Sequence, residues 1–298
     1  MDNIRYSVII PHYKSLDLLV KCIGSIPLRE DIQVIVVDDN SGIPEEYFTK
    51  EECFRRNNIE LVFSKVGGSA GRARNDGLKL AKGKWLIFAD ADDFFLDGAF
   101  DLCDRYSDSS YDIVYFGIKS VNSKTNEIVD RYNVYDRYVQ ACDNSTTDLI
   151  DNLRFHHDVP WGKMIRHKLV IDNNIRFGET RYCNDTLFST LTALKASSVY
   201  AEKACMYCVT FTDGSLTTQH SPEANMIRFE VMLQKNCLLR DNGYGKYRYS
   251  TLQYLNIARR FGLRYLFRAI RMADYYEAEY FRDLIRYIIG QKEKYQNR

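Results

Sequence analysis

Three aspartates follow directly on an apolar run in the segment WLIFADADDFF, which spans residues 85–95. Because alternate side chains of an extended chain share one face, Asp90 and Asp92 are expected to point into the same site. Their carboxylate oxygens suit magnesium, manganese or calcium, and so few protein ligands leave positions open for water and substrate phosphates. The spacing therefore predicts a divalent metal site at Asp90 and Asp92, whereas Asp93 and Asp97 are expected only to cap the next helix.

Two common nucleotide-binding motifs do not fit this chain. A P-loop requires G-x-x-x-x-G-K-[ST], whereas residues 77–85 hold five residues between their glycines and end in G-K-W. The dinucleotide fingerprint G-x-G-x-x-G belongs between the first strand and its helix, where this chain reads PHYKS. Both motifs are therefore excluded.

Composition and charge describe an ordinary globular protein of 298 residues, with 45% hydrophobic and 27% charged residues. The net charge of +1 gives no reason to expect a nucleic-acid partner. Residues 257–298 nevertheless carry 10 Lys and Arg against 5 Asp and Glu, which fits an anionic surface. The sequence has neither a long apolar span nor a secretory signal, so a cytoplasmic location with reduced cysteines is expected.

The elements that must position the acidic residues alternate between strand and helix patterns over the first half of the chain. Strands are predicted at residues 7–10, 33–37, 59–63 and 85–89, and helical spacing begins at Leu16, Pro44 and Ala70. This order predicts a mostly parallel, doubly wound sheet whose ligands gather at the carboxyl ends of its strands. Both acidic clusters, at residues 38–39 and 90–93, lie at such ends.

The second half has a looser pattern. A strand is predicted at 112–118, an irregular excursion at 119–146, helices at 161–171 and 186–196, and a strand at 199–211. From residue 225 the pattern is helical and rich in Tyr and Arg, with one face that carries Arg260, Arg264, Arg268 and Arg271. That face either lies on anionic lipid or is a solvated face of a helix packed on the domain, and both interpretations stay open.

Four segments in order resemble family 2 glycosyltransferases, which have the GT-A fold. They are SVIIPHYK at Ser7, VIVVDDNSG at Val34, GSAGRARNDGLKLAKGKWLIFADADD at Gly68, and WGKMIRHKLVIDNNIRF with the following CND at residues 161–185. The resemblance implies an α/β protein with a Rossmann-like, mostly parallel doubly wound sheet and a C-terminal helical extension. The expected GT-A domain covers residues 1–224, with a nucleotide-sugar half at 1–118 and an acceptor half at 119–224. A helical, basic, tyrosine-rich region then covers 225–298.

The resemblance also implies the residues that bind a nucleotide-sugar donor. Pro11, Tyr13 and Asp39 would line the nucleobase pocket, where a carboxylate can accept the imide hydrogen of uracil. Asp38 is expected to be structural, because neighbouring strand residues point in opposite directions. Arg74, and less clearly Arg72, would meet the diphosphate at the start of a helix.

For the remaining site residues, the resemblance implies that Asp90 approaches the ribose and that Asp92 holds a metal, Mn²⁺ or Mg²⁺, between the phosphates. Asp185 would be the catalytic base of an inverting transfer, although its position before TLFSTL equally suits a helix N-cap. Most members of the family that the chain resembles carry Glu-Asp where this chain has Asn184-Asp185.

Two further residues are assigned to the acceptor and to the metal or phosphate. The ring of Trp161 would pack against the acceptor sugar, and the alternative is that Trp161 is an ordinary core residue. His220 would be an extra metal or phosphate ligand, although a lone histidine is more often uninvolved.

The expected function is that of a metal-dependent, inverting glycosyltransferase that uses a UDP-sugar. Its acceptor would be a glycan or lipid-linked glycan of a surface polysaccharide, at the inner face of the membrane. One alternative is a haloacid-dehalogenase-type phosphatase, but Phe94 stands where its D-x-D-x-[TV] motif needs Thr or Val. Another is a non-catalytic nucleotide-sugar-binding or scaffold protein, against which the presence of Asp39, Asp92 and Asp185 argues.

Overall fold

The computed structural model describes residues 4–125, 127–130, 133–211, 221–280 and 283. The chain forms two compact units, Met1–Ser215 and Leu216–Arg298. The boundary expected between residues 224 and 225 falls inside a helix of the second unit, α9 (Pro222–Asp241).

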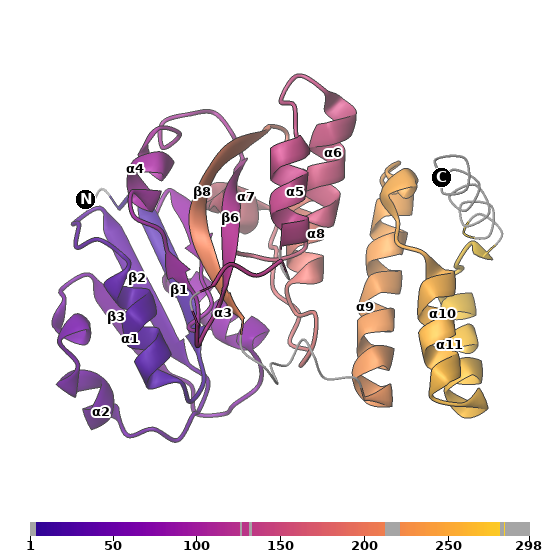
Figure 1. Ribbon diagram of the computed structural model, residues 1–298, viewed down its shortest axis with the longest axis horizontal. Helices are drawn as coiled ribbons and strands as arrows, with labels where there is room; N and C mark the ends of the chain where they lie inside the picture. Colours follow the sequence, from indigo (N-terminus) through magenta and orange to yellow (C-terminus); the bar gives the residue numbers. More distant parts are fainter. Residues whose placement is uncertain (1–3, 126, 131–132, 212–220, 281–282, 284–298) are drawn as a thin grey trace. The chain divides into compact units, whose positions relative to one another are not determined.

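The first half of the N-terminal unit alternates strands and helices as the apolar periodicity predicts (Figure 1). Its elements are β1 (Tyr6–His12), α1 (Leu16–Gly24), β2 (Ile32–Asp38), α2 (Glu45–Lys50), a 3₁₀ turn (Glu52–Arg55), β3 (Ile59–Phe63), α3 (Ala70–Leu80) and β4 (Trp85–Phe88). The second half contains β5 (Phe94–Phe95), α4 (Ala99–Asp104), β6 (Ile113–Asn122), α5 (Asn133–Ala141), α6 (Thr147–His156), β7 (Lys163–Arg166), α7 (His167–Asp172), α8 (Thr186–Lys195) and β8 (Val199–Phe211).

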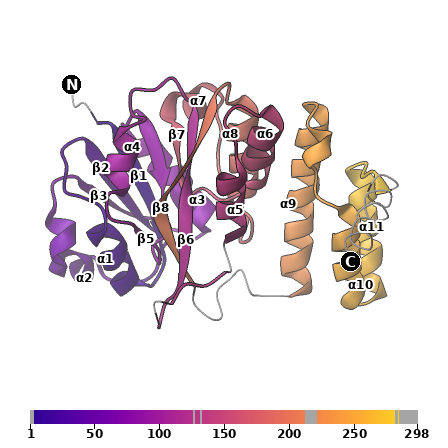
Figure 2. The same ribbon diagram turned by 45° about the horizontal axis from the view of Figure 1, so that its top comes forward.

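The eight strands of the described residues form one mixed sheet in the order β3-β2-β1-β4-β7-β6-β8-β5. The first four pair in parallel, as predicted, whereas β7 runs antiparallel to both β4 and β6. β6 and β8 then lie side by side in parallel (Figure 2). The carboxyl ends of β1, β2 and β4 therefore meet at one edge, which is where the acidic clusters lie.

Helices cover both faces of the sheet because successive strand residues point to opposite sides. Val8 and Ile10 of β1 pack with α1 and α4, whereas Ile9 packs with α3. Apolar side chains of α5, α6, α7 and α8 pack in the same cluster as Ile9 and α3. Helices α3 and α8 therefore cover the same face of the sheet.

Two predictions about the second half are wrong. Residues 161–171 are not one helix: the buried strand β7 occupies the middle of the sheet, and only α7 after it is helical. Residues 119–146 are not wholly irregular either, because β6 extends to Asn122 and α5 follows. The predicted strand at 199–211 coincides with β8.

The C-terminal unit contains α9, a 3₁₀ turn (Gly245–Tyr247), α10 (Thr251–Arg260) and α11 (Leu263–Tyr275). Phe229 and Leu233 of α9 pack with Ala258 of α10 and with Ala269 and Ala273 of α11. Within the described part of the chain, no helix is both long and apolar enough to cross a bilayer.

Candidate active site

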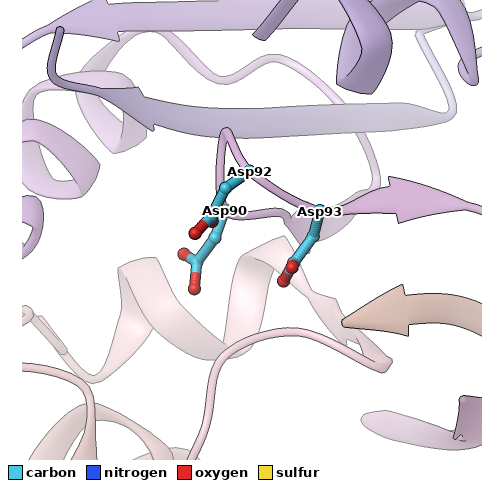
Figure 3. A group of neighbouring side chains, drawn as sticks. All are labelled: Asp90, Asp92 and Asp93. Atoms are coloured by element: carbon cyan, nitrogen blue, oxygen red, sulfur yellow. The ribbon is translucent and has the colours of Figure 1, made fainter. Parts of the chain in front are cut away.

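The acidic turn after β4 brings two carboxylates together at the carboxyl edge of the sheet. Strand β4 ends at Phe88, and the backbone N–H of Asp93 donates to the carbonyl of Asp90 over 3.1 Å. Asp90 and Asp92 therefore lie on a turn rather than on an extended strand, yet Figure 3 shows their side chains next to each other. Ligand oxygens of Asp90, Asp92 and Asp93 all lie within 4.8 Å of one another, so the donor set fits a hard divalent cation.

The electrostatics of Asp92 also favour a cation. Its carboxyl reaches solvent, but surrounding protein atoms and the nearby charge of Asp90 raise its pKa to about 6. A bound divalent cation would offset this repulsion between neighbouring carboxylates.

Asp93 differs from its two neighbours because it is buried and hydrogen-bonded to β8. It accepts from the Tyr207 hydroxyl at 2.9 Å and from the Thr210 backbone N–H at 2.7 Å. The prediction that Asp93 or Asp97 caps the next helix is wrong, since Gly98 is the N-cap of α4. Nothing in its sequence context marks Tyr207 as part of the site, because a tyrosine in a strand is more often a core residue.

Arg74 joins the acidic turn to the segment that precedes α8. Its Nη2 lies 2.5 Å from Asp90 Oδ1, and its Nη1 donates to Asn184 Oδ1 at 2.9 Å. The side chain is only 4% exposed and lies over the ring of Phe177. Two donors of the guanidinium are thus directed to protein groups, and the expected diphosphate contact stays a prediction.

The segment that precedes α8 packs closely against helix α3. A Cβ on Gly71 would overlap the carbonyl oxygen of Gly178, so the approach requires glycine. The Asn75 side chain donates to Phe177 O at 3.0 Å and accepts from Phe177 N–H at 2.8 Å. These contacts hold the chain that leads to Asn184 and Asp185 against the first turns of α3.

Asp185 occupies the N-cap position of α8, but its side chain makes no capping hydrogen bond. Burial, assisted by the charges of Asp90 and Asp158, raises its pKa to about 6, while Arg74 acts in the opposite direction. A carboxylate with this pKa can take a proton near neutral pH. This pKa suits the base role that the resemblance implies, and that role stays a prediction.

The nucleobase residues lie where β1 and β2 end. Asp39 is buried and accepts from the backbone N–H of Gly68 at 3.0 and 3.2 Å, and burial raises its pKa. Asp38 is held by His12 Nδ1 at 2.7 Å, which agrees with its predicted structural role. Pro11 is buried in β1, whereas Tyr13, just beyond that strand, is 55% exposed and presents an aromatic ring to solvent.

The two remaining predicted residues are Trp161 and His220. Trp161 is only 4% exposed, and its ring stacks on Tyr207 with centroids 5.8 Å apart. This burial disfavours the acceptor platform and favours the core alternative. His220 lies outside the described residues.

A Rossmann-like sheet with an aspartate turn after its fourth strand has the GT-A fold. A crystal structure of S. aureus TarS 1-349 shares this fold, with a TM-score of 0.62 at 23% identity, over 79% of this chain and 65% of that one. The family model for glycosyl transferase family 2 matches residues 7–173, more than half of the chain, and the chain belongs to this family.

Two of the curated relatives are named as poly(ribitol-phosphate) glycosyltransferases. A poly(ribitol-phosphate) beta-glucosyltransferase of Bacillus spizizenii is 26% identical over 74% of this chain and 35% of its own length. The poly(ribitol-phosphate) beta-N-acetylglucosaminyltransferase TarS of Staphylococcus aureus is 27% identical over 68% of this chain and 35% of its own length. The chain thus spans about a third of the length of these relatives. TarS 1-349 has also been crystallised with UDP-GlcNAc, and that structure matches with a TM-score of 0.60 at 20% identity.

Proposed function

We propose that this chain is an inverting glycosyltransferase that moves a sugar from a UDP-sugar to a hydroxyl of a surface-polysaccharide acceptor. The observation that carries the proposal is the contact of Arg74 with both Asp90 and Asn184, which joins the acidic turn to the segment of Asp185. One site thereby contains carboxylates suited to a metal-bound diphosphate and a carboxylate suited to proton removal. The family and the names of the relatives support the same reaction class.

In this proposal the donor lies along the carboxyl edge of the sheet. Tyr13, Pro11 and Asp39 receive the nucleobase, with the buried Asp39 as acceptor of an imide hydrogen. Asp90 contacts the ribose, and Asp92 is the protein ligand of Mn²⁺ or Mg²⁺. When bound, the metal neutralises charge on the departing diphosphate.

Asp185 removes the proton of the acceptor hydroxyl as that oxygen attacks the anomeric carbon from the side opposite the diphosphate. The C–O bond to the diphosphate breaks as the new glycosidic bond forms, so the anomeric configuration inverts. Asn184 accepts a hydrogen bond from Arg74 without adding a negative charge beside the base. This feature replaces the acidic neighbour of other family members.

The proposed acceptor is a glycan or lipid-linked glycan, of the polyol-phosphate kind that the names of the relatives give. The proposed location is the cytoplasm, with peripheral attachment to an anionic membrane. Arg264, Arg268 and Arg271 of α11 are exposed beside Phe267, which is 61% exposed, and such a mixed basic and apolar face suits anionic lipid.

Calorimetric titration of UDP, GDP, CDP and dTDP into the protein, with and without Mn²⁺, tests the donor assignment. Selective UDP binding that requires the metal, followed by sugar transfer from a UDP-sugar, is the expected result. Asp92→Ala should remove the metal-dependent part of UDP binding. Failure of the folded wild-type protein to bind any of the four nucleotides would favour a non-catalytic role.

A further inference from the structure

Tyr207 connects two members of the acidic cluster through a single hydroxyl. The hydroxyl accepts from the backbone N–H of Asp90 at 2.9 Å and donates to Asp93 Oδ2 at 2.9 Å. Asp93 Oδ1 in turn accepts from the Thr210 backbone N–H at 2.7 Å. The acidic turn is therefore attached at both of its ends to strand β8.

Aromatic packing holds the Tyr207 ring in place. Its ring lies 5.8 Å from Trp161 in a nearly parallel stack and 5.4 Å from Phe95 in an edge-on contact. Residues 94–95 also pair with 207–208 as neighbouring antiparallel strands. Because these contacts fix the ring, the hydroxyl is held in one position, and its hydrogen bonds hold the turn relative to β8.

Asp93 is buried, whereas Asp92 is exposed and Asp90 is partly exposed. Each of the Asp93 oxygens accepts a hydrogen bond from β8, which fixes the orientation of the carboxyl group. A buried polar group is costly unless it is hydrogen-bonded, and these two donors give each oxygen of Asp93 a partner.

We propose that Asp93 and Tyr207 are positioning residues, which hold the Asp90–Asp92 turn in the geometry that binds the divalent cation without ligating it themselves. The inference rests on the proposed metal-dependent binding of a nucleoside diphosphate. Partners that orient metal ligands typically contribute about 10- to 100-fold to metal affinity, which sets the size of the expected effect.

Tyr207→Phe tests the proposal because it keeps the ring and removes only the hydroxyl. The measurement is the Kd for Mn²⁺ in the presence of saturating UDP, obtained from the electron paramagnetic resonance signal of free Mn²⁺, with the Tm recorded in parallel. The variant is expected to bind Mn²⁺ at least about tenfold more weakly. Asp93→Asn replaces one of the two acceptor oxygens by an NH₂ group that cannot accept a hydrogen bond from β8, and it is expected to weaken Mn²⁺ binding as well.

Tyr6→Phe is the matched control. Tyr6 is also a buried strand tyrosine, and its hydroxyl donates to Asp104 Oδ1 at 2.8 Å, away from the acidic turn. It should lower the Tm as Tyr207→Phe does and leave the Kd for Mn²⁺ unchanged. Equal Kd values for wild type and Tyr207→Phe, or an equal loss in Tyr6→Phe, would overturn the positioning role. Absence of Mn²⁺ binding by the wild type would overturn the proposed metal dependence, and this inference with it.

Discussion

Asp185 combines a helix-start position with a carboxyl that does not cap the helix. An N-cap aspartate normally accepts a backbone N–H of the first turn, and such a bond lowers its pKa. Here that bond is absent, and the pKa is raised to about 6 instead. A carboxyl group with a raised pKa that does not cap its helix is typical of functional sites.

Asp185→Asn is expected to leave Mn²⁺-dependent UDP binding unchanged and to lower the rate of sugar transfer by about 10²- to 10⁴-fold, the usual contribution of a general base. In the wild type the ionised carboxylate is the active form. Because its pKa is about 6, the rate should rise with pH through that value and level off above it. Steady-state transfer rates between pH 5 and 8, with calorimetry of UDP on the same proteins, check both expectations.

Normal transfer by folded Asp185→Asn would exclude the base assignment. Asp172→Asn is a suitable control, since Asp172 is an exposed carboxylate on α7 that pairs with Lys168 at the surface. This control should leave both UDP binding and the transfer rate unchanged.

At the scale of elements, helix α3 decides how the two halves of the site meet. Its glycine at position 71 allows the backbone at Gly178 to approach closely, and Asn75 then fixes the neighbouring Phe177. The apolar periodicity predicts such a helix but not its contact, because periodicity reports only which face is buried. The same limit explains β7, a short strand that runs directly into α7 and was expected to be helix throughout.

Gly71→Ala is expected to destabilise the protein by about 1–3 kcal/mol, because the added methyl group overlaps the backbone of Gly178. The displaced segment carries Asn184 and Asp185, so transfer activity should fall as well. Gly24→Ala is the matched control, since a Cβ at this helical position meets nothing within 4 Å. Urea unfolding and transfer assays of the two variants compare them, and equal behaviour would show that the close approach is not required.

At the scale of the whole molecule, the sequence left open whether the basic face of the C-terminal helices lies on anionic lipid or is simply solvated. The described helices show which residues of this face are exposed. Ala269 and Ala273 of α11 are buried in the core of that unit, while Arg264, Arg268 and Arg271 are exposed. The basic residues therefore do not belong to the face that packs within the unit. Exposed Leu263, Phe267 and Tyr275 accompany them, which a purely solvated face would not need.

The combined variant Arg264→Glu, Arg268→Glu, Arg271→Glu is expected to bind phosphatidylglycerol vesicles at least about tenfold more weakly than wild type, since each basic residue near an anionic surface contributes about 1 kcal/mol. Vesicle co-sedimentation at low and high salt measures this, and binding by the wild type should weaken as salt rises. Arg55→Glu, a charge reversal at an exposed arginine of the N-terminal unit, is the control. Equal partitioning of wild type into phosphatidylglycerol and phosphatidylcholine vesicles would contradict membrane attachment by charge.

The sequence by itself determined the alternating strands and helices of the first half, the carboxylate composition of the acidic turn and the family. These follow from local patterns, because apolar periodicity and short motifs act over a few residues. Only the tertiary structure decided that Arg74 meets Asn184, 110 residues away, and that Tyr207 meets Asp93, 114 residues away. Such contacts depend on where β7 and β8 lie in the sheet. A hydrogen bond between residues far apart in the sequence produces no local pattern from which it could be predicted.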